Sequence, residues 1–281
     1  MVNNEILLQN TARIFRVARK VTGMTQVEVA KAIGISQSSV SKYEAGILQP
    51  SALDWFNFCT LVNLDSTKAL KDGYIDNCSR IKEFFYKDMG FTTPRRYKQN
   101  RHLKVREVLP MLVQYQAQFG EKGWLELAEK LKVDPDYFHV YDAPLSLNFL
   151  EDFMAQLPGT GKGFLDQAAK LSGDLAMHGD LKSYYQNASF SPNVGLAYVK
   201  KTSLYEEIFD VEQSLKGNKQ TFVFIPKDDF NSVGTPQFWN MYTHFKVESL
   251  RNFIVANSRS KESPVFISPQ KGKGLEIRLT A

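Results

Sequence analysis

The amino-acid sequence predicts two parts of different fold class: an all-α N-terminal region of about five helices, and a larger α+β region with a small, mostly antiparallel sheet. Three observations indicate this division. Apolar residues recur at helical spacing through residues 1–72, alternating and β-branched segments follow Pro192, and an excess of positive charge lies between the two. With 281 residues, 43% of them hydrophobic, the chain has the length of about two domains and can form a sizeable core.

Composition excludes several classes of protein. Two cysteines cannot form a disulfide framework, and no spacing of Cys and His matches a zinc site. No apolar run approaches the ~18 residues of a membrane span, and the first five residues lack the basic segment of a signal peptide. We therefore expect a soluble, cytoplasmic protein that needs no metal or other cofactor and does not bind membranes.

The first two helices are delimited by local signals. Apolar side chains repeat at helical spacing over residues 7–21, and Gly23 follows them. Thr25 and Glu28 have the spacing of a capping box, which predicts that a second helix begins there. Gly34 ends this second helix.

A third helix is predicted from Gln37 to Ala45, with Ser36 as its cap, and Ser51 caps a fourth. Two short helices joined by a glycine turn, the second opening with small polar residues, have a shape that fits the DNA major groove. Val40 is the only aliphatic residue in the first turn of the third helix, so it is expected to face the preceding helix. The opposite face then carries the candidate base-reading residues Gln37, Ser38, Ser41 and Lys42.

These residue types suit DNA recognition. Gln pairs in two ways with adenine N6 and N7, Ser bonds either kind of base edge, and Lys prefers guanine or phosphate. Gln26 begins the second helix, where its amide and the helix N-terminus can hold a phosphate. The alternative interpretation of the same outward face is an ordinary solvated surface.

More than ten residues between Thr25 and Pro50 share one spacing pattern, which reads Thr25-Gln26-x-Glu28-Val29-Ala30-x-x-x-Gly34-Ile35-Ser36-x-x-x-Val40-Ser41-x-x-Glu44-x-Gly46-x-x-x-Pro50. This pattern resembles the Cro/phage-repressor (XRE) helix-turn-helix family over roughly residues 9–65. The resemblance implies a lambda-repressor-like fold for the N-terminal region. It also implies that Gln37, Ser38 and Lys42 read bases, that Gln26 and Ser39 lie near the DNA backbone, and that Arg19 and Glu44 form a buried structural ion pair.

The loop after the third helix departs from this family. Many relatives carry Lys or Arg there to contact phosphate, whereas this loop is Gly46-Ile47-Leu48-Gln49-Pro50. Because each phosphate contact contributes to DNA affinity, the N-terminal region alone should bind DNA modestly. Either another segment supplies positive charge, or Ile47 and Leu48 serve a protein contact.

Residues 73–107 are predicted to form a basic, aromatic linker or dimer arm. Between Thr93 and Arg106 there are six basic residues and no acidic one. Two interpretations stay open: an arm that follows the DNA backbone, and a solvated connector between domains. The candidate phosphate contacts are Arg95, Arg96, Lys98 and Arg101.

Residues 108–281 are predicted to form the α+β domain. Helices are expected over 108–119, 124–131, 147–157, 164–171 and 236–257, and strands over 194–200, 220–225 and 275–280. No enzyme motif is found there, so we do not expect an enzyme. Of these 174 residues, 24 are Phe, Tyr or Trp, which suits a ligand cavity, a core or an interface equally.

The combined expectation is a sequence-specific transcriptional regulator that binds double-stranded DNA as a homodimer on a palindromic operator. Its domains would be a DNA-binding head (1–72), the basic segment (73–107), and a dimerisation domain that also senses a small-molecule or protein effector (108–281). One alternative is an interaction adaptor or antitoxin-like module with incidental DNA binding. The other is a C-terminal enzyme tethered to DNA.

Overall fold

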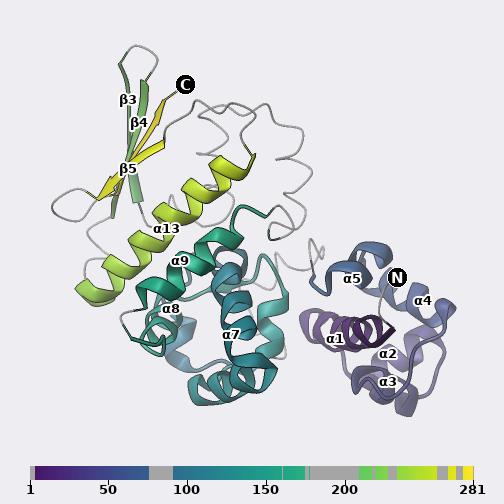
Figure 1. Ribbon diagram of the computed structural model, residues 1–281. Helices are drawn as coiled ribbons and strands as arrows, with labels where there is room; N and C mark the ends of the chain where they lie inside the picture. The colour runs from purple at the N-terminus through teal and green to yellow at the C-terminus, as the bar shows by residue number, and fades with distance from the viewer. Residues whose placement is uncertain are drawn as a thin grey trace. The chain divides into compact units, whose positions relative to one another are not determined.

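A computed structural model describes residues 4–75, 91–159, 161–174, 177, 209–216, 219–226, 233–257, 265–269 and 275–280. The chain divides into two compact units (Figure 1). The first comprises Met1–Pro94 and Ala128–Ala143, and the second comprises Arg95–Leu127 and Pro144–Ala281. Residues 128–143 therefore belong with the N-terminal helices, although they are distant from them in sequence.

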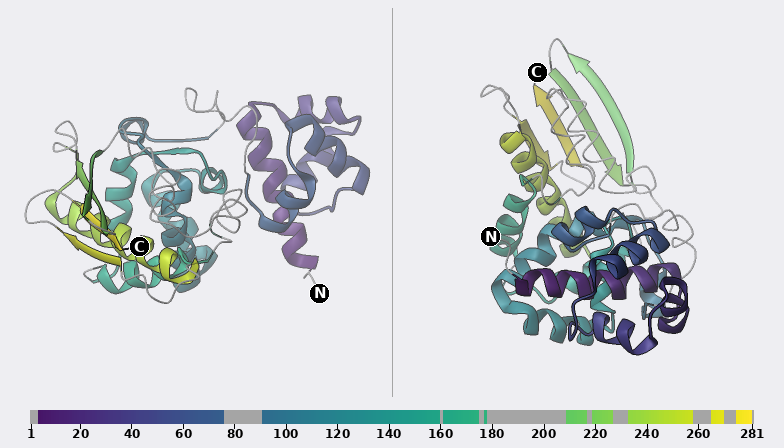
Figure 2. Two further views of the ribbon diagram at one scale, coloured as in Figure 1. Left: turned by 90° about the horizontal axis from the view of Figure 1, so that it is seen from above. Right: turned by 90° about the vertical axis from the view of Figure 1, so that its right-hand side faces the viewer.

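Five helices build most of the first unit: α1 (Asn4–Thr22), α2 (Gln26–Ile33), α3 (Gln37–Glu44), α4 (Ala52–Val62) and α5 (Ser66–Asp72). Figure 2 shows this bundle from two further directions. Its core is aromatic, because Phe15 of α1 stacks on Phe58 of α4 at 3.9 Å and also contacts Tyr43 and Trp55. The prediction of an all-helical N-terminal region is confirmed.

The 128–143 segment joins this bundle through backbone hydrogen bonds. A short 3-10 helix, η2 (Pro135–His139), precedes a parallel bridge between Ile75 and Val140. The Ile75 amide donates to the His139 carbonyl at 2.8 Å, and the Tyr141 amide donates to the Ile75 carbonyl at 3.2 Å. The chain just after α5 is thus held by residues 139–141.

Helices dominate the described part of the second unit. They are η1 (Arg95–Lys98), α7 (Val105–Leu131), α8 (Leu147–Met154), α9 (Lys162–Leu171) and α13 (Pro236–Asn257). The last turn of α7, residues 128–131, belongs to the first unit. Gly120 interrupts α7 with a φ of 73°, as the predicted break between two apolar stripes requires. Helices α9 and α13 pack side by side (Figure 1), with Phe245 and Phe253 of α13 fully buried.

Two antiparallel sheets complete the second unit. Strands β1 (Leu103–Lys104) and β2 (Pro144–Leu145) form a two-stranded sheet. The larger sheet has the order β3-β4-β6-β5, from β3 (Phe209–Lys216), β4 (Lys219–Pro226), β6 (Leu275–Thr280) and β5 (Val265–Pro269). Neighbouring strands are all antiparallel. The α+β prediction is confirmed.

The individual elements can be compared with their sequence patterns. The predicted strands at 220–225 and 275–280 correspond to β4 and β6, and the predicted helix at 236–257 is α13. Strands β3 and β5 were not predicted, and the predicted strand at 194–200 lies outside the described residues. Among the described residues, no helix combines the length and apolar character needed to cross a membrane.

Candidate nucleic-acid interface

The turn between α2 and α3 is held by side-chain caps. Thr25 Oγ1 accepts a hydrogen bond from the Glu28 amide at 3.2 Å, and Glu28 Oε2 accepts one from the Thr25 amide at 2.7 Å. The bonds that Glu28 accepts from Thr25 lower its pKa. Gly34 ends α2 at a φ of 78°, and Ser36 Oγ accepts a bond from the Ser39 amide at 3.0 Å. Local bonds therefore define where both helices begin.

Helix α3 has one apolar and one polar face. Val40 is fully buried and Tyr43 is buried beside Phe15, so the apolar face of α3 is turned into the core. The Tyr43 hydroxyl donates to Asp54 Oδ2 at 2.8 Å, which ties α3 to α4. The polar side chains on the other face are exposed for Gln37, Ser38 and Lys42 and half-buried for Ser41.

Glu44, the last residue of α3, is a buried centre of polar contacts. Arg19 of α1 binds its carboxylate with two nitrogens, Nε to Oε1 at 2.5 Å and Nη2 to Oε2 at 2.9 Å. The Glu44 side chain is only 7% exposed. Gln26 Nε2 donates a further bond to Glu44 Oε2 at 2.9 Å. One carboxylate therefore joins the first three helices.

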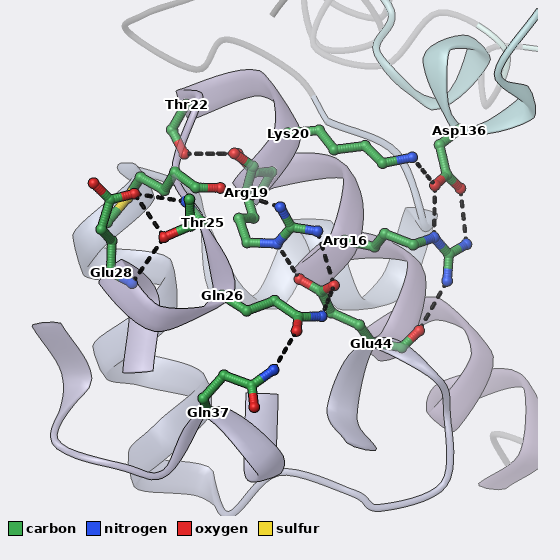
Figure 3. A network of polar contacts seen from close by, with 12 residues as sticks. Arg16, Arg19, Lys20, Thr22, Thr25, Gln26, Glu28, Gln37, Glu44 and Asp136 are labelled. Atoms are coloured by element: carbon green, nitrogen blue, oxygen red, sulfur yellow. Dashed lines mark hydrogen bonds and ion pairs between the residues drawn. The ribbon is translucent and has the colours of Figure 1, made fainter. Parts of the chain in front are cut away.

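This carboxylate decides how two glutamine amides are oriented (Figure 3). An ionised carboxylate only accepts hydrogen bonds, so Gln26 must direct its NH₂ group to Glu44 and its carbonyl oxygen away. Gln37 Nε2 donates to that oxygen at 2.7 Å. Gln37 thus keeps its own carbonyl oxygen and one N–H for another partner. Among the described residues, Gln37 Oε1 accepts no hydrogen bond.

Gln26 and Ser39 lie at helix starts. Gln26 is the first residue of α2, and Ser39 is the third residue of α3, with its hydroxyl 2.9 Å from that of Ser36. Backbone N–H groups at a helix N-terminus favour anions such as phosphate. Both residues are half-buried.

The predicted phosphate contacts of the basic segment belong to the second unit. Arg95, Arg96 and Lys98 are exposed on η1, and Arg96 Nη2 lies 3.3 Å from both Glu151 and Asp152 of α8. Arg101 is half-buried, and its Nε donates to the Tyr97 carbonyl at 3.1 Å. The buried Tyr97 hydroxyl donates to Asp152 Oδ2 at 2.8 Å, which anchors η1 on α8. The segment is thus folded onto the second unit.

The uncharged loop after α3 is exposed. Ile47 is 75% and Leu48 is 44% exposed, and Leu53 and Phe56 of the neighbouring helix α4 are also exposed. Isolated apolar side chains are common on protein surfaces, but four within ten residues form an apolar group. No basic residue accompanies them between Gly46 and Asn63.

Two acidic residues of the 128–143 segment, Asp134 and Asp136, form ion pairs with α1. Asp136 binds Arg16 through two bonds, at 2.6 and 2.8 Å, and Lys20 Nζ lies 2.6 Å from Asp134 and 2.9 Å from Asp136. Burial alone would raise the pKa of Asp136, but the hydrogen bonds and charges of Arg16 and Lys20 outweigh it and lower the pKa to about 2. No local sequence signal indicated these contacts, since 120 positions separate Arg16 from Asp136.

The comparison with known families decides what this bundle is. A family described as Helix-turn-helix matches residues 16–62, which contain the end of α1 and all of α2, α3 and α4. Residues 16–62 are an XRE/Cro-like helix-turn-helix. The comparisons with curated proteins and with solved structures found no match. The resemblance stated from the sequence is therefore confirmed for the N-terminal part of the chain.

The family that matches residues 16–62 is one of DNA-binding regulatory domains. Within the described residues, no three or more His, Cys, Asp and Glu side chains are grouped so that they could hold a metal ion. The polar groups on and around α3 are amides, hydroxyls and charged side chains, which can form hydrogen bonds with bases and phosphates.

Proposed function

We propose that this protein is a sequence-specific, DNA-binding transcriptional regulator in which α3 reads bases. The observation that carries the proposal is the Glu44–Gln26–Gln37 arrangement. It leaves Gln37 with an outward carbonyl oxygen and an N–H, the pair that adenine N6 and N7 require. Such a bidentate pair contributes about 1–3 kcal/mol of discrimination against a wrong base.

The other polar groups of the helix-turn-helix have complementary roles in this proposal. Ser38 and Lys42 are exposed on the same helix and add base contacts, with the half-buried Ser41 beside them. Gln26 and Ser39, at the two helix starts, contact phosphate and fix the register of α3 on the duplex. The exposed arginines and lysine of η1, together with Arg101, supply the positive charge that the loop after α3 lacks.

We further infer that the protein acts as a homodimer on a palindromic operator. One helix with a few base contacts discriminates weakly, and two helices on half-sites about one helical turn apart double the contacts. The second unit would provide dimerisation and would sense a small-molecule or protein effector. An effector regulates only if it binds one arrangement of the two heads more tightly than the other.

The test is selection of duplexes from randomised oligonucleotides with the full chain and with Gln37→Ala. Wild type should enrich one sequence with two related half-sites, and Gln37→Ala should lose preference at one base pair in each. Gln9→Ala is the matched control, because Gln9 is an exposed amide on α1, outside the helix-turn-helix contacts. Equal enrichment by all three proteins would contradict a base-reading role for Gln37.

An adaptor or antitoxin-like function is favoured by one observation, the exposed apolar group of Ile47, Leu48, Leu53 and Phe56. In that case the protein should purify with one stoichiometric partner and should enrich no duplex. Ile47→Ser with Leu48→Ser would then abolish the partner complex. Under the regulator proposal, the same double substitution leaves base preference unchanged.

A further inference from the structure

Asp134 and Asp136 hold α1 through an ion-pair cluster that is partly withdrawn from solvent. The Asp136 side chain is 9% exposed and that of Lys20 is 19% exposed, while that of Arg16 is 36% exposed. Exposed ion pairs contribute little to stability, but a partly buried pair with several hydrogen bonds keeps its geometry, and breaking it leaves a charge without its partner. This cluster therefore constrains the α1 side chains that take part in it.

Arg16 connects this cluster to α3, the candidate base-reading helix. Its Nε and Nη2 bind the Asp136 carboxylate, while its Nη1 donates to the backbone carbonyl of Glu44 at 2.8 Å. A guanidinium group is planar and rigid, so the two bonds to Asp136 also fix the direction of the third donor. The C-terminal end of α3 is thus held by a side chain whose own orientation depends on Asp136.

The contacts continue without a gap to the candidate base-reading amide (Figure 3). The Glu44 carboxylate is bound by Arg19 and Gln26, and Gln26 accepts a hydrogen bond from Gln37. Hydrogen bonds and ion pairs therefore join successive members of one series: Asp136, Arg16, Glu44, Gln26 and Gln37.

Asp134 keeps Asp136 in place. Its Oδ1 accepts a hydrogen bond from the Asp136 amide at 3.0 Å, and its Oδ2 binds Lys20 at 2.6 Å. The Asp134 amide in turn donates to the Thr92 carbonyl at 3.2 Å. Together with the backbone bonds at Ile75, these contacts hold the segment at both ends of η2.

We propose that Asp134 and Asp136 are positioning residues for DNA recognition, which hold Arg16 and Lys20 so that α3 presents Gln37 to the base pairs. This inference rests on the proposed function. It extends the DNA-reading part of the chain beyond residues 16–62 to the 128–143 segment, which lies more than 60 positions further along the sequence. Because residues 128–143 continue at both ends into the second unit, a ligand that shifts those ends would act on α3 through these two carboxylates.

If only charge mattered, removing the Asp136 carboxylate would change DNA affinity in the opposite direction. The direction of the change in affinity therefore tests the proposal. A carboxylate on a DNA-binding unit repels phosphate, so its removal should strengthen DNA binding if only charge matters. If Asp136 positions α3, its removal should weaken binding to the preferred duplex. Asp136→Asn keeps the shape of the side chain and removes the charge.

The experiment compares full-length wild type, Asp136→Asn and Glu129→Gln on the duplex selected by wild type and on a scrambled duplex. Glu129 is an exposed carboxylate in the same 128–143 segment, so Glu129→Gln is the matched control. For Asp136→Asn, the affinity for the selected duplex should fall between about twofold and thirtyfold, the usual range for residues that couple through others. The scrambled duplex should be affected less, and the control should bind both as wild type or slightly more tightly. Unchanged or tighter binding by Asp136→Asn would overturn the proposal.

A second set of variants separates positioning from a loss of folding. Asp136→Glu retains the charge and should recover most of the base preference. Arg16→Lys removes the bidentate geometry, so combining it with Asp136→Asn should cost no more affinity than the larger single effect. Additive losses would show that the two residues act independently and would contradict the proposal. Thermal unfolding of each variant identifies any that is unfolded at the assay temperature.

The two proposals fail in different ways. If wild type prefers no duplex, the proposed function is wrong. If wild type has a preference that Gln37→Ala loses but Asp136→Asn keeps in full, only the positioning role is wrong.

Discussion

Two basic clusters of this protein meet carboxylates in different settings. In the first unit, Arg16 and Lys20 bind Asp134 and Asp136 at 2.6–2.9 Å, with the Asp136 side chain 9% exposed. In the second unit, Arg96 reaches Glu151 and Asp152 only at 3.3 Å and remains 55% exposed. The first arrangement constrains a helix, whereas the second can be given up for a phosphate at small cost.

The difference indicates which positive charges are available for DNA. Charges that are already neutralised inside a unit act through geometry, and exposed charges act through counterion release. The helix-turn-helix has few exposed basic residues near α3, with Lys42 on the helix itself.

Replacement of the buried carboxylate at the centre of the first unit should have the largest effect. Glu44→Gln leaves Arg19 as a largely buried charge without its partner, so the free energy of unfolding should fall by about 3 kcal/mol. Arg96→Gln, which removes only an exposed pair, should cost less than about 1 kcal/mol. Urea unfolding measures the loss of free energy of unfolding for both variants. Hydrogen exchange of the backbone amides of α1, α3 and η1 then locates each effect. Equal costs would refute the contrast between buried and exposed ion pairs.

The free energy of unfolding of the first unit should depend on pH through His139, a buried histidine of the 128–143 segment. Burial, helped by the charges of Arg13 and Arg16 and opposed by Asp136, lowers the pKa of His139 to about 3, and its Nδ1 is enclosed. The unfolded chain binds a proton at this residue below about pH 6.5 and the folded chain does not, so stability falls as the pH decreases.

Between pH 7 and pH 5 this single site should reduce the free energy of unfolding by about 2 kcal/mol. His139→Phe keeps a ring beside Tyr74 and should remove most of the slope in this range. Asp136 contributes little there, because its carboxyl titrates below pH 5 in both states, with a pKa of about 3.9 in the unfolded chain and about 2 in the folded chain. A slope that persists in His139→Phe would mean that another group titrates.

Neutralising the basic residues of the 95–101 segment should have the smallest effect on folding but a distinct effect on DNA binding. If Arg95, Arg96, Lys98 and Arg101 contact phosphates, each substitution by Gln should reduce the slope of log affinity against log salt by about 1. Base preference should not change, because phosphate contacts carry no sequence information. An unchanged slope would identify the segment as a connector.

The comparison also shows which contacts the sequence reveals. The caps at Thr25, Ser36 and Ser51 and the turn at Gly34 are formed within a few residues, so their spacing is visible in the sequence. The Gly120 break and the β4 and β6 strands follow from apolar periodicity for the same reason. Strand β3 has Phe209, Val211 and Leu215 at alternating positions, a signal that was present but interrupted by Gln213.

The 128–143 segment had no comparable signal in the sequence for its contacts with α1. Asp134 precedes a proline and Asp136 follows one, which indicates a turn and nothing about a partner. The basic run at 95–106 was visible as charge, but its folding onto α8 depends on Tyr97 and Asp152, which are 55 positions apart. Net charge along a sequence does not indicate which charges are already paired.

The sequence alone therefore determined the helix boundaries, the outward polar face of α3 and the resemblance to the helix-turn-helix family, because each depends on interactions between near neighbours in the chain. Only the tertiary structure decided that Asp136 holds Arg16 and that Glu44 orients Gln26 and, through it, Gln37. These contacts join residues between 11 and 120 positions apart, and their geometry exists only once the packing of the helices brings the groups together.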